Sequence, residues 1–280
     1  MQGPALRWKN EGDRVTDLEL IGLNLAVIAA VVVVLWLISL PLRDVSFVDA
    51  FWPVGFGVVA WTTYLAVAPD HPRALLLLAL TSLWSVRLGT YLLARWLSEP
   101  HEDKRYQAMR AKRPHFAYQS LYVVFGLQGV LIVAVSVPVM FGIANAQAPL
   151  GWLDAFGVVM FTAGFLCESI ADSQLAAFRR DEKNAGHVLD RGLWAWSRHP
   201  NYFGNTLIWW GLFAIAASDI ANLWTIAGPL LMTWLILKVS GVDMLERGLY
   251  RSKPHYAAYA TQTARFIPRP PRKRRAQQHN

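Results

Sequence analysis

The chain has 280 residues, of which 54% are hydrophobic and 16% charged, and it carries a formal net charge of +8. Its one cysteine, Cys167, excludes a disulfide framework and a cysteine-based metal site within a single chain. Thirteen tryptophans and several apolar runs near the roughly 20 residues that cross a bilayer predict an all-α, polytopic membrane helix bundle.

Seven apolar stretches are candidate membrane spans, and the sixth is short enough to be a tilted or partial one. They cover 20–42, 47–68, 74–97, 118–143, 150–175, 202–217 and 222–240. We expect one integral membrane domain over 1–280, located in the inner membrane of a bacterium or the endoplasmic reticulum of a eukaryote.

The basic residues predict the orientation of these spans. Lys and Arg are frequent in 98–117, in 176–201 and after 241, but are absent from the connections 144–149 and 218–221. Basic loops remain in the cytoplasm, so we expect the N-terminus outside and the C-terminus inside. The basic tail 269–280 is expected to contact anionic lipid headgroups. Nucleic acid is not an expected partner, because no base-stacking pattern accompanies the charge.

Ionisable side chains within spans are costly and therefore candidates for function. Asp49 lies on the second span and Arg87 on the third, where Trp84, Arg87 and Tyr91 share one helix face. Asp49 and Arg87 are expected to pair, either in a functional site or only to lock two spans together.

Polar residues also gather near the cytoplasmic end of the fifth span. Glu168, Asp172 and Arg179 follow helical spacing, and Gln174 and Phe178 lie beside them. Carboxylates accept hydrogen bonds from hydroxyls and amides, and a guanidinium binds phosphate, so this stripe suits a polar, phosphorylated ligand. The alternative is a solvated helix end, which fits Arg179 better than Glu168.

The loop 98–117 permits two readings. Its Asp103, Arg105 and Tyr106 either belong to an ordinary basic loop or clamp a nucleotide.

The segment Ser197–Asn205 combines a cation, an imidazole and two amides. Pro200 is expected to begin a helix, whose first turn presents free N–H groups beside Arg198. The segment is an anion-binding corner, or Arg198 and His199 are only interfacial anchors. No dinucleotide-binding glycine fingerprint, Walker loop or zinc-protease motif occurs, and His199 lacks partners at metal-ligand spacing, so no metal is expected.

Taken together, these residues resemble a known family. Arg198-His199-Pro200-Asn201-Tyr202-Phe203-Gly204, followed by a last span and by Glu246, Tyr256, Tyr259 and Phe266-Ile267-Pro268, is similar to the C-terminal domain of the steroid 5-alpha-reductase family. The likeness is greatest to a bacterial branch and covers about 45–268. Sterol C14 reductases and isoprenylcysteine carboxyl methyltransferases share the Arg-His-Pro-x-Tyr core.

The resemblance implies a seven-helix bundle that holds NADPH. Asp172, Arg179, Asn201, Arg105, Arg87 and Tyr91 match the family's cofactor positions. The full cofactor-binding set that we expect is Arg87, Tyr91, Asp103, Arg105, Tyr106, Glu168, Asp172, Gln174, Phe178, Arg179, Trp196, Arg198, His199, Asn201, Tyr202, Asn205 and Glu246.

The resemblance also implies catalytic positions at Asp49, Trp84, Arg87 and Tyr91, with two departures from the family. Trp84 stands where steroid reductases carry their proton-donating tyrosine, and Asn205 stands where they carry a glutamate. Asp49 corresponds to the glutamate partner of that tyrosine. Tryptophan donates a hydrogen bond but is no practical acid at neutral pH, so Asp49 or Tyr91 is the expected donor.

The expected function is hydride transfer from NADPH to a conjugated C=C of a lipophilic, steroid-like or other enone substrate. One alternative is methylation of a lipid or prenylcysteine with S-adenosylmethionine, and another is lipid binding without catalysis. Membrane lipids and a lipophilic small molecule are the expected partners.

Overall fold

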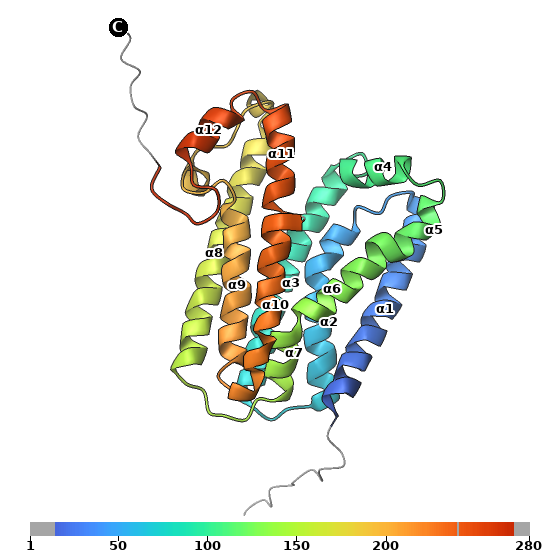
Figure 1. Cartoon of the computed structure of the whole chain (residues 1–280), viewed down its shortest axis with the longest axis vertical. Coiled ribbons are helices and arrows are strands. Elements are labelled where there is room, and N and C mark those ends of the chain that lie inside the picture. Colours follow the sequence, from blue (N-terminus) through green and yellow to red (C-terminus); the bar gives the residue numbers. More distant parts are fainter. Residues whose placement is uncertain (1–14, 240, 272–280) are drawn as a thin grey trace, which may run out of the picture. The chain divides into compact units, whose positions relative to one another are not determined.

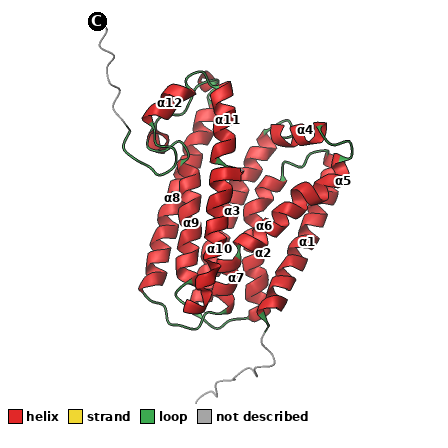
Figure 2. Ribbon diagram, in the orientation of Figure 1, coloured by secondary structure: helices red, strands yellow, loops and turns green. Residues whose placement is uncertain are grey.

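The computed structural model describes residues 15–239 and 241–271, and these residues form helices and loops with no β-strand among them (Figures 1 and 2). The N-terminal residues 1–14 and most of the basic tail, 272–280, lie outside the described residues. The sequence predicts one domain; the contacts of the chain gather into two compact units, which meet in sequence between Ala148 and Pro149.

The first unit contains three long helices followed by shorter helical segments. Its elements are α1 (Asp17–Leu42), α2 (Val48–Val67), α3 (Pro72–Ser98), α4 (Lys104–Ala111), α5 (Phe116–Ser120), a π-helical segment (Leu121–Gly126), α6 (Leu127–Val135) and α7 (Val137–Ala144).

Local sequence signals explain where the long helices of this unit begin. Thr16 and Glu19 form a capping box at the start of α1, in which each side chain satisfies a backbone N–H of the other residue. His71 caps α3, and Pro72 occupies its first position, where the missing N–H is not needed. Buried aromatic side chains such as Phe56 and Phe125 fill the core of the unit.

The second unit contains a long helical pair and a C-terminal helical segment. Its elements are α8 (Trp152–Arg180), short 3-10 turns at Glu182–Asn184 and Gly192–Ala195, α9 (Pro200–Ala216), a 3-10 segment (Ile220–Ile226), α10 (Ala227–Trp234), a π-helical segment (Leu235–Val239), α11 (Val242–Ser252) and α12 (Tyr256–Gln262).

Glycines bring the backbones of α8 and α9 into direct contact. A Cβ atom on Gly164 would lie 2.5 Å from the carbonyl oxygen of Gly204, and one on Gly157 would lie 2.6 Å from that of Gly211. On each helix the two glycines are seven residues apart, so both lie on the face toward the partner helix. Small residues at a helix interface permit this close approach within membranes.

Six helical stretches are long and apolar enough to cross a membrane, and the chain is a multi-pass membrane protein. These stretches are Asp17–Leu42, Val48–Val67, Pro72–Ser98, Phe116–Val135, Trp152–Arg180 and Ile220–Ser252. The short sixth span expected from the sequence is α9, which has 17 residues and packs along α8 (Figure 1).

Candidate functional site

The chain that enters α9 is held in place by the C-terminal segment of the same unit. α9 begins at Pro200, as predicted. The Ser197 hydroxyl donates to the carbonyl of Phe266 at 2.7 Å, and the backbone N–H of Arg198 donates to the carbonyl of Ala264 at 2.8 Å. The Tyr259 hydroxyl donates to the carbonyl of Trp194. These bonds fix the backbone that carries Arg198 and His199.

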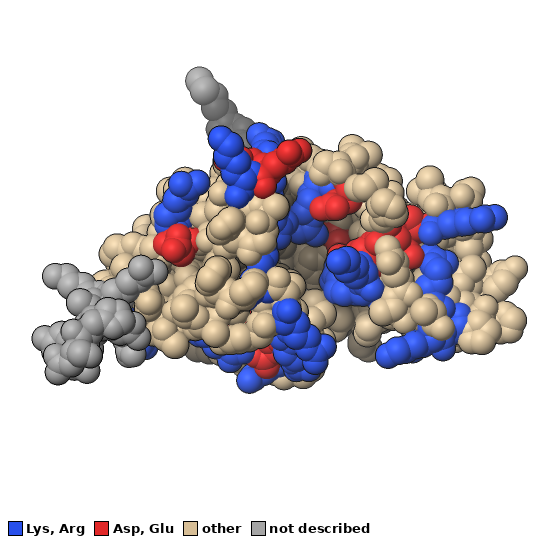
Figure 3. All heavy atoms as spheres, turned by 90° about the horizontal axis from the view of Figure 1, so that it is seen from above, with Lys and Arg blue, Asp and Glu red and all other residues tan. Residues whose placement is uncertain are grey.

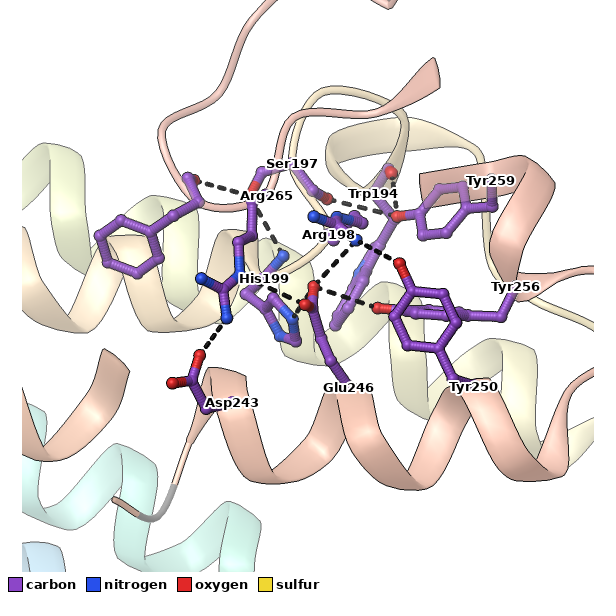
Figure 4. Close-up of polar contacts among 11 residues, drawn as sticks. Trp194, Ser197, Arg198, His199, Asp243, Glu246, Tyr250, Tyr256, Tyr259 and Arg265 are labelled. Atoms are coloured by element: carbon purple, nitrogen blue, oxygen red, sulfur yellow. Dashed lines mark hydrogen bonds and ion pairs between the residues drawn. The ribbon is translucent and has the colours of Figure 1, made fainter. Parts of the chain in front are cut away.

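Glu246 on α11 is the centre of a compact polar cluster (Figure 4). Its Oε1 lies 3.0 Å from Arg198 and 3.3 Å from His199 Nε2, and its Oε2 lies 3.2 Å from Arg265. The Tyr256 hydroxyl lies 3.4 Å from the same carboxylate. We call these five residues the Glu246 cluster. Glu246 and Arg198 are each about 10% exposed in their side chains, so this ion pair is largely desolvated.

His199 is neutral at pH 7 within this cluster. Burial is the main cause that lowers its pKa to about 4, and the positive charges of Arg198 and Arg265 lower it further. Glu246 favours the imidazolium and offsets part of this shift. The Tyr202 ring stacks on the imidazole, with 5.9 Å between the ring centroids. A neutral imidazole donates from one ring nitrogen and accepts at the other, so His199 supplies both functions at the start of α9.

Two amide–carboxylate pairs join α8 and α9 next to the glycine contact. Asn205 donates from its side-chain amide to Glu168 at 2.9 Å, and Asn201 donates to Asp172 at 3.1 Å. Both carboxylates belong to residues that are only 3% exposed. Glu168 and Asp172 of the predicted stripe therefore lie on the face of α8 that packs against α9.

Other predicted cofactor residues of this unit have different surroundings. Gln174 accepts a hydrogen bond from the backbone of Leu193 at 3.0 Å, so its side chain supports a turn. Phe178 is half-buried, Arg179 lies exposed at the end of α8, and Trp196 is 46% exposed.

Asp49 has partners in the first unit that the sequence did not indicate. We expected Asp49 to pair with Arg87; it instead contacts the Arg105 guanidinium and accepts from the Tyr106 hydroxyl at 2.7 Å. Gln128 donates to the same hydroxyl at 3.3 Å. The physical reason is the N-cap of α4, where Asp103 accepts from the backbone N–H of Arg105 and directs this turn toward the start of α2.

Burial and the charge of Asp49 raise the pKa of Tyr106, so its hydroxyl stays protonated. Burial disfavours the charge on Arg105, but the hydrogen bond that Arg105 donates to Asp103 and the charge of Asp49 raise the pKa of the guanidinium. The pKa of Asp103 is lowered, because the bonds from Arg105 outweigh its own burial.

The three predicted residues of α3 are placed on that helix as expected. Trp84 is fully buried and packs against Phe56 with 5.6 Å between ring centroids. Arg87 lies over the Tyr91 ring at 5.5 Å.

The sequence did not indicate Arg265 of the Glu246 cluster, because its position depends on the fold of the C-terminal segment, which no local spacing reveals. Asp243, which pairs with Arg265, follows a helical i, i+3 relation to Glu246. That relation was a usable signal. Among the described residues, no group of three or more His, Cys, Asp and Glu side chains is arranged to hold a metal ion.

The family of the chain follows from a match over most of its length. The sequence model of a family described as "Protein of unknown function (DUF1295)" matches residues 35–263. The chain belongs to this DUF1295 family. The matched region includes Asp49, Glu168 on the α8–α9 face, and Arg198 and Glu246 of the Glu246 cluster.

A fungal protein is similar over much of both chains. It is the "Uncharacterized protein C594.04c" of Schizosaccharomyces pombe, 26% identical over 268 residues, which cover 84% of this chain and 76% of the relative. No solved structure matches the chain significantly.

Proposed function

We propose that the protein is a membrane-embedded reductase that uses NADPH to reduce a conjugated C=C of a lipophilic enone. The observation that carries the proposal is the buried polar face on α8 and α9, where Glu168 meets Asn205 and Asp172 meets Asn201. Buried carboxylates and amides at a helix interface are expensive, which favours a polar ligand over packing alone. The similarity of Arg198–Gly204 to steroid 5-alpha-reductases supports the same reading.

The chemistry of this face fits a nucleotide cofactor. The side-chain oxygen of Asn205 and the Nε of Arg198 are buried and have no partner among the described residues. The first accepts from a ribose hydroxyl or a carboxamide, and the second donates to a phosphate oxygen. Arg179 and Arg180 are exposed at the end of α8, where a further phosphate is within the reach of long side chains.

Under this proposal the chain's own residues bind and orient the cofactor and polarise the carbonyl of the substrate. Glu168, Asp172, Asn201 and Asn205 hold hydroxyl and amide groups, while Arg198 and the end of α8 hold phosphate. NADPH supplies the hydride that is added to the β-carbon of the enone, and a proton is added to the α-carbon. Polarising the carbonyl requires a donor in a dry site.

The structure changes which group we propose as that donor. Asp49 is ion-paired with Arg105, and an ion-paired carboxylate accepts hydrogen bonds and does not donate them. The neighbouring Tyr106 keeps its proton and donates a hydrogen bond to Asp49 in the free protein; we propose that this hydroxyl turns to the carbonyl of the enone when substrate binds, and so replaces Asp49 as the donor. Phenylalanine at this position removes the hydroxyl and leaves the ring.

A methyltransferase that uses S-adenosylmethionine is the second candidate. One observation favours it: Glu246 already neutralises Arg198, which leaves less positive charge for phosphate at the start of α9. S-adenosylmethionine has no phosphate and carries hydroxyls and an amine that carboxylates bind.

The test is a thermal-shift titration of the full chain in detergent with NADPH, NADH and S-adenosylmethionine. We expect NADPH to raise the melting temperature at lower concentration than NADH, because a charge-assisted bond to its 2′-phosphate contributes about 1.5–3 kcal/mol. Arg179→Gln with Arg180→Gln should abolish this preference and leave the melting-temperature shift caused by NADH unchanged. The exposed Lys183→Gln is the matched control. Stabilisation by S-adenosylmethionine alone would replace the proposal with the second candidate.

The activity test follows NADPH oxidation with a 3-keto-4-ene steroid. Tyr106→Phe should lower turnover by roughly 100-fold or more, the usual contribution of a positioned proton donor, without changing the NADPH titration. Full activity of Tyr106→Phe would remove this hydroxyl from the reaction.

A further inference from the structure

A basic pocket lies in the first unit, where α4 ends and α5 begins. It has a volume of about 390 Å³, and its walls include Arg110, Lys112, Arg113, Pro114 and Phe116. Lys and Arg side chains stand out on the face of the molecule that is seen from above in Figure 3. The pocket begins four residues after Tyr106, the proposed donor, but it shares no residue with the proposed reductase site.

Positive charge remains uncompensated in this pocket. Arg110 is held by two hydrogen bonds to Glu102, at 3.0 and 2.7 Å, and lies 4.8 Å over the Phe116 ring, so it forms a fixed and neutralised wall. Lys112 is exposed and Arg113 is half-buried, and neither forms an ion pair with an acidic residue in the described part of the chain. These two cations can receive an anion.

The position of the pocket corresponds to the headgroup level of a bilayer. Phe116 is the first residue of the apolar span Phe116–Val135. The Trp36 indole near the end of α1 donates to the carbonyl of Ala117 at 2.8 Å. Tyr118 is 69% exposed and Tyr122 is 63% exposed on the helix that follows. Tryptophan and tyrosine favour the interface between headgroups and hydrocarbon, so they mark this depth.

An exposed apolar surface continues from the pocket into the span. Leu127 and Val130 are 54% and 59% exposed, and they follow Tyr122 by five and eight residues. The segment Leu121–Gly126, between them and Tyr118, is π-helical, so its backbone hydrogen bonds run from residue i to residue i+5. Acyl chains can therefore lie against this helix below a bound headgroup.

We infer that this pocket binds the phosphate of an anionic phospholipid. Lys112 and Arg113 receive the phosphate, Arg110 and Phe116 form its rigid wall, and the acyl chains cover the exposed face of α5 and α6. A free phosphate ion would satisfy the cations but would leave that apolar face uncovered. Basic pockets at the cytoplasmic ends of spans bind acidic headgroups in this way.

The test measures lipid binding to the full chain in detergent by native mass spectrometry. Dioleoylphosphatidylglycerol is the anionic probe, dioleoylphosphatidylcholine the zwitterionic one, and inorganic phosphate and NADPH are competitors. Wild type should bind the anionic lipid in preference, and Lys112→Gln with Arg113→Gln should reduce that binding roughly tenfold. Lys112→Arg with Arg113→Lys keeps the charges and should retain the preference.

The matched control is Lys183→Gln with Arg251→Gln, which removes the same two charge types from exposed positions of the second unit. It should bind the anionic lipid as wild type does. If the variant with Lys112→Gln and Arg113→Gln bound the anionic lipid as strongly as wild type does, the inference would be overturned. Displacement of the lipid by millimolar inorganic phosphate would assign the pocket to a free anion. Displacement by NADPH would assign it to the cofactor, and either result contradicts a lipid site.

Discussion

Glu246 is the residue on which the charge balance of its cluster depends. Glu246→Gln keeps the size of the side chain but leaves Arg198 and Arg265 without this carboxylate. Because Arg198 is largely buried, we expect a loss of about 3–5 kcal/mol in the free energy of unfolding. A thermal melt in detergent measures the loss. Glu182→Gln, at an exposed position, is the control and should melt like wild type.

His199 should make the stability of the protein depend on pH. Its pKa is about 4 in the folded chain and 6.5 when unfolded, so the unfolded chain binds more protons between these values. The contribution of His199 to stability is therefore full above pH 6.5 and is lost as pH falls toward 4, by about 1.4 kcal/mol per pH unit.

The measurement compares melts of wild type and His199→Gln between pH 7 and pH 5. Over this range the variant should lose about 2 kcal/mol less stability than wild type. His187→Gln, at an exposed position, should keep the wild-type dependence. Identical pH profiles for wild type and His199→Gln would show that the imidazole is not buried in its neutral form.

How far single residues can be predicted depends on whether their partners are local. Helical spacing was enough to place Glu168 and Asp172 on one stripe, and Pro200 was enough to mark the start of α9. The partner of Asp49 was not predictable, because it depends on how the loop with Arg105 folds back onto α2. Charge alone favoured Arg87, which lies on a neighbouring span.

At the scale of elements, the glycine contact between α8 and α9 determines the distance between their polar side chains. Gly164 and Gly204 touch one turn before Glu168 and one residue before Asn205, so the same contact that closes the helices brings this pair together. The sequence predicted both helices but not this register, because two glycines seven residues apart are too weak a signal by themselves.

Replacing these glycines should separate the helices. In Gly204→Ala the new methyl group would lie 2.6 Å from the backbone N of Glu168 and from the carbonyl oxygen of Gly164, so backbone atoms must move. We expect a loss of about 1–3 kcal/mol in stability, measured by thermal melting. Gly164→Ala should lower stability in the same way. The variant with both substitutions should lose less stability than the sum of the losses of the two single variants.

The control for this experiment is Gly248→Ala on α11, where nothing lies within 4 Å of the added methyl group. Alanine there should raise stability by about 0.5–1 kcal/mol, because glycine loses more chain entropy in a helix. Equal effects at positions 204 and 248 would contradict a close backbone contact between α8 and α9.

At the scale of the whole molecule, each of the two units contains its own polar cluster of ionised side chains. Asp49 with Arg105 and Tyr106 belongs to the first unit, and the Glu246 cluster belongs to the second. Hydropathy was sufficient to predict the helical class and nearly all span positions, because the apolar runs are long. The division into two units was not predictable, since the short connection 144–149 has the composition of any loop.

The orientation of the chain in the membrane depends on whether α9 crosses the bilayer. Seventeen residues of helix extend about 25 Å, slightly less than a hydrocarbon core of about 30 Å, and α9 packs against α8, which has 29 residues. If α9 crosses, the basic segments 98–117 and 176–201 face the cytoplasm, while Gln147 and Ile220 face outward. Single cysteines introduced at these two positions, in a Cys167→Ala background, should react with an impermeant maleimide on intact cells. Cysteines at the exposed positions of Lys104 and Ala185 should react only after the membrane is opened. Labelling of Ile220→Cys and Ala185→Cys from the same side would show that α9 does not cross, and the seven-span orientation would then be wrong.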